Sequence, residues 1–297
     1  MRAIVTGGAG FIGSHVVDAL LARGDDVLVL DDLSTGKREN LSDGAQLEVV
    51  DIREPLADRF EGAEVCFHLA AQADVRVSIE CPDHDAQVNV LGTISVLEAA
   101  RRRGTQVVFA STGGAIYGEC EGPAPEESPR LPLSPYGVSK LAAEEYLSAY
   151  NRLHGTGHVT LRYGNVYGPR QDPHGEAGVV AIFFGRLATG EPARIFGDGR
   201  QTRDYVYAGD VARATLAAVG REGVFNVGTG IETSVLELYE LCRRVAGSEL
   251  EAAQAEARLG ELQRSVLDVS LAERELGWRP EVPLEEGLGL TWRSLAG

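Results

Sequence analysis

The sequence predicts an α/β fold in which a doubly wound parallel sheet is joined to a smaller mixed α/β domain. Short apolar runs rich in β-branched residues recur through the first half of the chain, and helical stretches lie between them. This alternation is typical of parallel strands whose connecting helices cover both faces of a sheet. The pattern changes after about residue 168, where glycine, proline and charged residues surround two short apolar segments. A helix-rich, acidic region follows from Thr233.

Each element of the large sheet follows from such a run. The expected strands cover residues 3–5, 27–30, 47–50, 65–69, 107–109, 159–161 and 224–227. Two of the expected helices cover residues 13–22 and 88–103, where apolar residues form one stripe. Residues 1–168 form the expected sheet domain, with a returning segment near 210–232. Residues 169–209 and 233–297 form the expected second domain.

Composition and charge argue against several classes of protein. The 297 residues carry a net charge of −16, which opposes a basic nucleic-acid-binding face. No apolar run approaches the length of a membrane span. The four cysteines lack the spacing of a metal site, and the N-terminus does not resemble a signal peptide. We therefore expect a cytoplasmic protein that binds no metal, nucleic acid or membrane.

A glycine-rich loop follows the first strand and opens the first helix. Gly7, Gly10 and Gly13 are spaced G-x-x-G-x-x-G. Glycine permits a tight turn and lets backbone N–H groups approach a pyrophosphate at the helix N-terminus. The alternative is a plain strand–helix turn, but the strand–loop–helix context favours a dinucleotide site and hence a Rossmann sheet.

Acidic residues end the next two strands. Asp31 and Asp32 come where a carboxylate accepts hydrogen bonds from the adenosine ribose, which favours NAD over NADP. Lys37 and Arg38 lie nearby and weaken this preference. Asp51 and Ile52 could meet the adenine, although a solvated strand end explains Asp51 nearly as well.

A tyrosine and a lysine stand one helical turn apart. Tyr136 and Lys140 share a helix face, and a nearby ammonium group favours phenolate, so this tyrosine could act as a general acid or base. Ser111 and Thr112 end the fifth strand, where either hydroxyl could lie beside Tyr136. An ordinary surface pair and a loop cap are the alternative explanations.

Seven segments together carry a resemblance to a known family. They read TGGAGFIGSH at 6–15, DDLSTG at 31–36, HLAA at 68–71, NVLGT at 89–93, YGVSK at 136–140, RYGNVYGP at 162–169 and TRDYV at 202–206. In this order they resemble extended short-chain dehydrogenases/reductases, and more narrowly UDP-glucose 4-epimerases. The resemblance implies NAD as cofactor, a UDP-hexose substrate and a homodimer formed through helices near 89–103 and 138–154.

The resemblance also implies roles for individual residues. Tyr136 is the implied acid/base, Lys140 the group that tunes it, and Thr112 (or Ser111) the hydroxyl that binds the reacting sugar. The implied NAD contacts are Gly7, Gly10, Phe11, Ile12, Gly13, Asp31, Asp32, Ser34, Thr35, Gly36, Asp51, Ile52, Leu69, Ala70, Ala71, Asn89, Tyr136, Lys140 and Tyr163. The implied substrate contacts are Thr112, Asn165, Val179, Phe196, Arg203, Arg258, Glu261 and Ser265.

The implied reaction interconverts UDP-glucose and UDP-galactose by oxidation at C4, rotation of the 4-keto sugar and re-reduction. Related dehydratases and decarboxylases carry acids where this chain has Gly113 and Gly114, which cannot transfer protons. A small residue at Ser265 leaves room for an N-acetyl group, which would admit UDP-GlcNAc and UDP-GalNAc. The alternatives are a uronate epimerase, a 4,6-dehydratase, a decarboxylase, or a non-catalytic NAD-binding sensor.

Overall fold

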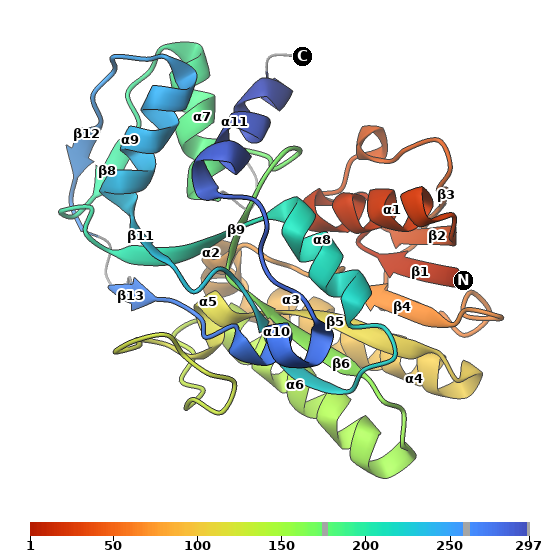
Figure 1. Cartoon of the computed structure of the whole chain (residues 1–297). Helices are drawn as coiled ribbons and strands as arrows, with labels where there is room; N and C mark the ends of the chain where they lie inside the picture. Colours follow the sequence, from red (N-terminus) through yellow and green to blue (C-terminus); the bar gives the residue numbers. More distant parts are fainter. Residues whose placement is uncertain (174–177, 258–261, 296–297) are drawn as a thin grey trace.

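A seven-stranded parallel sheet forms the centre of the molecule (Figure 1). The computed structural model describes residues 1–173, 178–257 and 262–295. The strand order is β10-β6-β5-β4-β1-β2-β3. The strands are β1 (Arg2–Thr6), β2 (Asp26–Asp31), β3 (Gln46–Val49), β4 (Val65–His68), β5 (Gln106–Thr112), β6 (Val159–Tyr163) and β10 (Gly223–Val227). The predicted α/β class with a doubly wound parallel sheet is confirmed.

Helices cover both faces of this sheet and bury two separate apolar layers. One layer joins the sheet to α1 (Phe11–Arg23) and α8 (Ala208–Ala217) through residues such as Val17 and Val211. The other joins it to α4 (Thr93–Arg103) and α6 (Pro135–His154) through residues such as Leu97 and Leu147. Because both faces are covered, central strands such as β1 and β4 are buried and mainly apolar on both sides rather than alternating.

The helix predicted at 88–103 begins differently in the structure. The chain instead forms α2 (Val75–Glu80), α3 (Pro82–Ala86), a π-helical turn at Gln87–Gly92 and then α4. Within the π turn, the hydroxyl of Thr93 donates to the carbonyl of Asn89 at 2.7 Å. A Cβ on Gly92 would lie 2.6 Å from Cδ1 of Ile52, so the helix approaches this neighbour closely. The π turn contains the buried Asn89, and π turns are frequent at functional sites.

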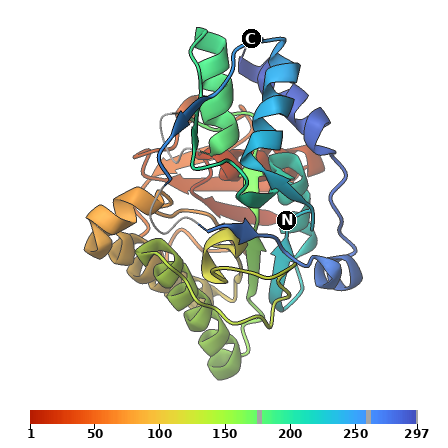
Figure 2. The same cartoon turned by 90° about the vertical axis from the view of Figure 1, so that its left-hand side faces the viewer.

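A second group of strands and helices stands at one end of the sheet (Figures 1 and 2). Its helices pack around a third apolar cluster that includes Phe183, Tyr239 and Leu288. They are α7 (Val179–Thr189), α9 (Val235–Ala246) and α11 (Leu284–Leu295). The strands are β7 (Asn165–Tyr167), β8 (Arg194–Phe196), β9 (Thr202–Tyr207), β11 (Glu232–Ser234), β12 (Ala253–Ala255) and β13 (Arg264–Ser265).

One late segment packs on the large sheet rather than in the second group. Helix α10 (Ser270–Leu276) contributes Ala272 and Leu276 to the first apolar layer, and Trp278 follows them there. The indole N–H of Trp278 donates to the carbonyl of Asp210 at 3.0 Å. The predicted second domain, residues 233–297, therefore includes a segment that packs with the sheet domain. Within the described ranges, no helix combines the length and apolarity needed to cross a membrane.

A buried histidine precedes β6 and makes the fold sensitive to acid. His158 accepts a hydrogen bond at Nδ1 from the backbone N–H of Val107 at 3.1 Å. Its proton therefore lies on Nε2, which has no hydrogen-bond partner among the described residues. Burial lowers the pKa of His158 to about 4. The folded protein thus keeps this ring neutral.

Acid should therefore destabilise the fold through His158. Below about pH 6.5 the unfolded chain takes up a proton that the folded chain refuses, so stability is lost as the pH falls toward about 4. His158→Asn keeps an acceptor near the Nδ1 position but does not titrate. Between about pH 6.5 and pH 5, the wild type should lose about 1.5 kcal/mol more unfolding free energy than this variant. Urea titrations measure this, with His154→Asn at an exposed position as the control; equal losses in all three proteins would contradict it.

Candidate active site

The predicted site residues gather at the carboxyl edge of the large sheet, where the direction of strand order reverses. Strands β1 and β4 lie side by side in the centre of the sheet, with Thr6 opposite His68. The chain continues from β1 to one side of the sheet and from β4 to the other. In open α/β sheets, ligands bind at the carboxyl ends of the strands at such a point.

The glycine loop after β1 lies against the loop after β4. Gly7 has φ of +69°, and a Cβ there would lie 2.5 Å from the backbone nitrogen of Ala70. A Cβ on Gly13 would lie 2.8 Å from Cα of Gly8, so neither position accepts a larger residue without a backbone shift. Phe11 and Ile12 form the first turn of α1 between these glycines.

The N-terminus of α1 has the donors that a diphosphate requires. Its N-cap is Gly10, no side chain caps the helix, and its first turn contains no acidic residue. The unpaired N–H groups and the helix dipole therefore remain for an anion. This donor set fits the pyrophosphate of a dinucleotide.

The carboxylate of Asp31 supports the loop after β2. Oδ2 accepts from the N–H of Ala9 and Oδ1 from the N–H of Leu33, both at 2.9 Å. Burial raises the pKa of Asp31 above its usual value. A Cβ on Gly36 would lie 2.7 Å from Oδ1 of Asp31, so this loop folds tightly over the carboxylate.

The remaining residues of the predicted adenosine site differ in their exposure to solvent. Asp32, Ser34 and Thr35 are exposed, and Asp32 accepts hydrogen bonds from both the N–H and the hydroxyl of Ser34. Asp51 is paired with Arg53, whose hydrogen bonds lower the pKa of that carboxyl. Ile52 is buried in the second apolar layer.

A chain of hydrogen bonds fixes the end of β4, where Leu69, Ala70 and Ala71 begin. The hydroxyl of Thr93 donates to Asn89, so its oxygen accepts from Nε2 of His68 at 3.0 Å. Nδ1 of His68 then accepts from the hydroxyl of Thr6 at 2.7 Å, and Thr6 accepts from the N–H of Ala70. Burial, with a smaller contribution from Lys140, lowers the pKa of His68 to about 3. The ring is therefore a neutral connector between three elements.

The side chain of Asn89 is directed toward protein groups. Its Oδ1 accepts from the N–H of Gln72, and its Nδ2 donates to the carbonyl of Gln72, both at 2.9 Å. The same Nδ2 lies 3.0 Å from Oδ1 of Asp85 and 3.1 Å from Oγ of Ser139. Sequence reasoning missed Asp85, although its spacing of four residues from Asn89 on one helical stretch was a local signal. Asn89 thus holds the loop that follows Ala71.

The side chain of Tyr163 points away from the edge. It is buried in the first apolar layer, and its hydroxyl lies 2.8 Å from Oγ1 of Thr215 on α8. A contact between the Tyr163 ring and NAD is therefore excluded, whereas a contact through the backbone of Tyr163 at the end of β6 stays a prediction.

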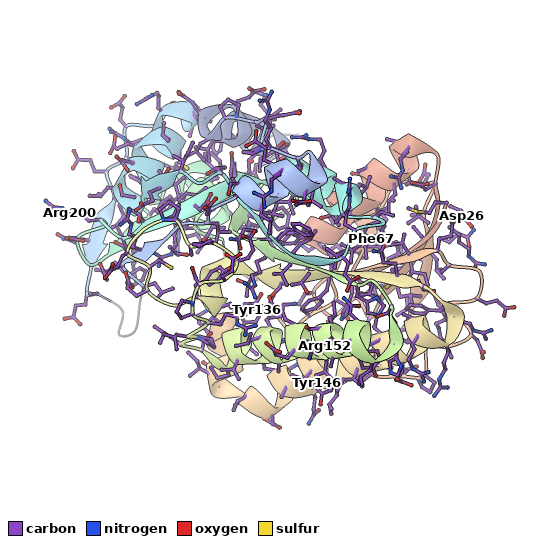
Figure 3. All side chains as sticks on the ribbon, turned by 60° about the horizontal axis from the view of Figure 1, so that its bottom comes forward. Asp26, Phe67, Tyr136, Tyr146, Arg152 and Arg200 are labelled. Atoms are coloured by element: carbon purple, nitrogen blue, oxygen red, sulfur yellow. The ribbon has the colours of Figure 1, made fainter. Side chains whose placement is uncertain are left out.

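Tyr136 and Lys140 lie in the first two turns of α6. Ser134 caps this helix, accepting at its Oγ from the N–H of Gly137, and Pro135 occupies the first turn. Lys140 is only 3% exposed, and its Nζ lies 4.4 Å from the centre of the Phe109 ring. Figure 3 shows Tyr136 near the amino-terminal end of the helix. The hydroxyl of Ser139 donates to the carbonyl of Tyr136, which connects this turn to Asn89.

Ser111 and Thr112 leave β5 on opposite faces. Phe109 belongs to the layer beneath α6, so strand alternation places Ser111 on that face. Its buried Oγ has no hydrogen-bond partner among the described residues. A Cβ on Gly114 would lie 4.0 Å from Oγ1 of Thr112 and 3.4 Å from Oδ1 of Asn165, so Thr112 and Asn165 flank one small volume.

The predicted substrate residues of the second group come from several elements. Arg203 on β9 is paired with Ser265 on β13, and Ser265 is buried. Val179 begins α7, and Phe196 ends β8. Arg258 and Glu261 lie outside the described residues.

A buried ion pair stabilises the same end of the sheet. The side chains of Arg162 and Glu144 are 2% and 3% exposed, and Nη2 of Arg162 lies 2.7 Å from Oε2 of Glu144. Arg162 also donates to the hydroxyl of Tyr117 at 2.7 Å. Burial opposes the charge, but the hydrogen bond and charge of Glu144 outweigh it and raise the pKa of Arg162. The sequence contained one signal for this ion pair, which was an arginine directly after an apolar strand.

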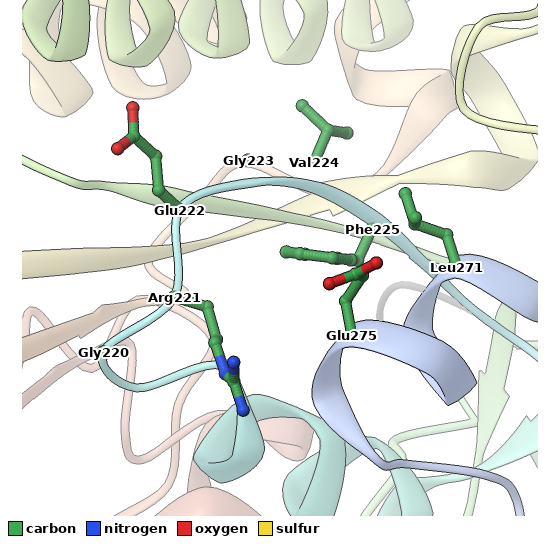
Figure 4. A pocket seen from close by; sticks show the side chains of 8 residues that line it. All are labelled: Gly220, Arg221, Glu222, Gly223, Val224, Phe225, Leu271 and Glu275. Atoms are coloured by element: carbon green, nitrogen blue, oxygen red, sulfur yellow. The ribbon is translucent and has the colours of Figure 1, made fainter.

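A hollow of the described surface lies elsewhere. It measures about 450 Å³ and is found at the amino end of β10, beside α10 (Figure 4). Its lining residues are Gly220, Arg221, Glu222, Gly223, Val224, Phe225, Leu271 and Glu275. None of these belongs to the predicted site, which lies at the carboxyl ends of the strands.

Comparison with known proteins identifies the family. The model of the NAD dependent epimerase/dehydratase family matches residues 3–228. The chain belongs to this family. Membership confirms the predicted relationship, the dependence on NAD and the prediction of an enzyme. Membership in this family also agrees with the glycine loop and with the uncapped N-terminus of α1.

Several family members are similar to this chain over almost its whole length. A UDP-glucose 4-epimerase of Mycolicibacterium smegmatis is 48% identical over 98% of this chain and 97% of its own length. The structure of a UDP-glucose 4-epimerase of Thermotoga maritima with UDP-glucose is 47% identical, with a TM-score of 0.97 over 100% of this chain and 99% of that one. The UDP-glucose 4-epimerase of Thermus thermophilus in complex with NAD is 49% identical, with a TM-score of 0.95 and the same coverage.

Proposed function

We propose that this chain interconverts UDP-glucose and UDP-galactose as an NAD-dependent 4-epimerase. The observation that carries the proposal is the buried Lys140 one helical turn from Tyr136, at the strand edge that also holds the glycine loop and two hydroxyls. The relatives named above, which cover nearly the whole chain, support it.

Tyr136 is the proposed acid and base for the sugar 4-hydroxyl. The ammonium group of Lys140 favours the phenolate of Tyr136, which removes the proton from O4 and later returns it. Thr112 donates a hydrogen bond to O4 from the side of Asn165, and Ser111, on the face of β5 that α6 covers, is the alternative hydroxyl. NAD, when bound, supplies the hydride acceptor and donor.

The proposed NAD site combines the glycine loop with the ends of β2, β3 and β4. Gly7, Gly10 and Gly13 bring the N–H groups of α1 to the diphosphate. Asp31 and Asp32 take the adenosine ribose, and a carboxylate there disfavours a 2′-phosphate. The other proposed contacts are Phe11, Ile12, Ser34, Thr35, Gly36, Asp51, Ile52, Leu69, Ala70 and Ala71, while Asn89 acts by holding the loop after Ala71.

The second group of elements is the proposed UDP-sugar domain, with residues 169–209 and 233–297 as its approximate limits, apart from α10, which packs on the large sheet. Arg203 and Asn165 are proposed to bind the diphosphate, because the fork of arginine binds two oxygens at once. Phe196 and Val179 are proposed to lie beside the nucleoside, and Arg258 and Glu261 stay predictions. Holding the UDP leaves the hexose able to turn between two orientations.

The first test is an incubation of the purified protein with UDP-galactose and no added NAD, followed by chromatography. We expect UDP-glucose as product, because a cofactor regenerated in each turnover need not be supplied. A 4-keto product or release of CO₂ would instead identify a dehydratase or a decarboxylase. Both are disfavoured by Gly113, where a Cβ would lie 2.6 Å from Cδ2 of Leu267. No conversion of any UDP-sugar would contradict the proposal.

Ser265 is the proposed determinant of sugar size. Its place next to Arg203 in the sheet puts it beside the proposed diphosphate site. We expect Ser265→Tyr to lower kcat/KM for UDP-GalNAc at least tenfold more than for UDP-galactose, since its ring would fill the space of an N-acetyl group. Ser265→Ala is the control and should leave the ratio unchanged. An equal loss with both sugars in Ser265→Tyr would contradict this role.

We also propose a cytoplasmic homodimer. Helix α6 exposes Val138, Tyr146 and Leu153, which are 53%, 42% and 75% exposed. Figure 3 shows Tyr146 on the outside of this helix. An apolar stripe of this kind favours pairing with a second copy. The thiols of Cys66, Cys81, Cys120 and Cys242 are free, which agrees with a reducing compartment.

A further inference from the structure

One guanidinium joins three parts of the chain beside the glycine loop. Arg170 donates from Nη2 to Oδ2 of Asp18 at 2.7 Å and to Nδ1 of His15 at 3.0 Å, both on α1. Its Nη1 donates to the carbonyl of Asn40 at 2.9 Å. Because Arg170 can only donate, His15 carries its proton on Nε2 and donates it to the carbonyl of Pro169 at 3.0 Å.

The backbone of Arg170 is in an unusual conformation. Its φ is +69°, a left-handed value found for one other non-glycine residue in the described ranges, Leu33. Such conformations persist where the surroundings over-determine them, and they cluster at functional sites. In this conformation the side chain of Arg170 contacts both α1 and Asn40.

The segment that Arg170 holds is in turn tied to the proposed adenosine site. The N–H of Lys37 and the side-chain amide of Asn40 both donate to the carbonyl of Ala9 in the glycine loop, at 2.9 Å and 2.8 Å. The N–H of Ala9 donates to Asp31. A second tie joins Nζ of Lys37 to Asp172 at 2.9 Å. Residues 170 and 172 therefore fasten the loop at 37–40 onto the loop that would hold NAD.

We propose that Arg170 is a positioning residue that retains the cofactor by fastening this loop. The inference rests on the proposed function, because an enzyme that regenerates its NAD in every turnover gains from not releasing it. In this proposal the loop after β2 covers the adenosine half of NAD, and its movement away from the glycine loop is the step that releases the cofactor. Arg170 opposes that movement and takes no part in proton or hydride transfer.

Binding of NAD in the absence of sugar tests the proposal. Arg170→Gly removes the guanidinium and suits a φ of +69°. We expect the Kd of the apo-protein for NAD, measured by calorimetry, and the rate of NAD loss from the holoenzyme to rise at least tenfold. With saturating NAD, kcat should stay within about threefold of the wild type. A tenfold change corresponds to about 1.4 kcal/mol.

Two further variants sharpen the test. Arg170→Lys keeps the charge but cannot reach α1 and Asn40 at once, so it should give an intermediate increase in Kd. Arg200→Gly removes an arginine that is 85% exposed in the second group and should leave NAD binding unchanged.

The outcomes separate this inference from the proposed function. Unchanged NAD binding in Arg170→Gly would overturn it, as would a loss of kcat at saturating NAD that matches the loss of affinity. If the wild type binds NAD but converts no UDP-sugar, the proposed function fails while the measurements of Kd still decide the role of Arg170.

Discussion

Tyr136→Phe is expected to lower kcat for UDP-galactose about 10³-fold, the scale on which a positioned general acid–base group acts. The phenylalanine ring keeps the packing of the first turn of α6 but cannot take or return the proton of the sugar 4-hydroxyl. Lys140 is not placed to replace it, since its Nζ lies over the Phe109 ring. Steady-state kinetics with UDP-galactose measures the change.

The control is another tyrosine on the same helix. Tyr146 lies on the outer face of α6, 42% exposed, so Tyr146→Phe should keep nearly full activity. The NAD content of Tyr136→Phe should match that of the wild type, because the glycine loop is unchanged. Near-full activity in Tyr136→Phe would remove the proposed mechanism.

Glu144→Ala is expected to lower the free energy of unfolding by about 3–5 kcal/mol, the usual cost of breaking a buried pair. The substitution leaves the guanidinium of Arg162 buried without its counter-charge, with Tyr117 and a backbone carbonyl as neutral partners. Urea unfolding measures the loss.

An exposed pair on the same helix provides the matched control. Glu145 is paired with Arg130, and their side chains are 51% and 41% exposed. Glu145→Ala should cost less than about 1 kcal/mol, because solvent screens such pairs. Similar losses in the two variants would show that burial of the Arg162 pair contributes no more than surface pairing.

Most of the large sheet could be predicted because its strands are local signals. Each is a short apolar run rich in β-branched residues, and Gly24 and Gly104 end the helices α1 and α4 as left-handed caps. The π turn at Gln87–Gly92 could not be predicted in this way. It depends on how Gly92 meets Ile52, a contact between residues forty positions apart.

The candidate site also contains features that local sequence predicts and features that it does not. The ends of strands and the first turn of α6 follow from local sequence, so the positions of Thr112, Tyr136 and Lys140 at one edge could be anticipated. The directions of Asn89 and Tyr163 could not, because Gln72 and Thr215 bind these side chains from elements 17 and 52 residues away. Periodicity assigns a residue to an element, whereas distant hydrogen-bond partners determine where its side chain points.

The packing of α10 on the large sheet has a consequence for how the chain is made. Ala272, Leu276 and Trp278 complete an apolar layer whose other members include Ala3 and Val5 from the first strand. A ribosome must therefore release nearly the whole chain before the earliest strand is fully covered. Until then the nascent sheet exposes apolar surface, which makes the incomplete chain prone to aggregation.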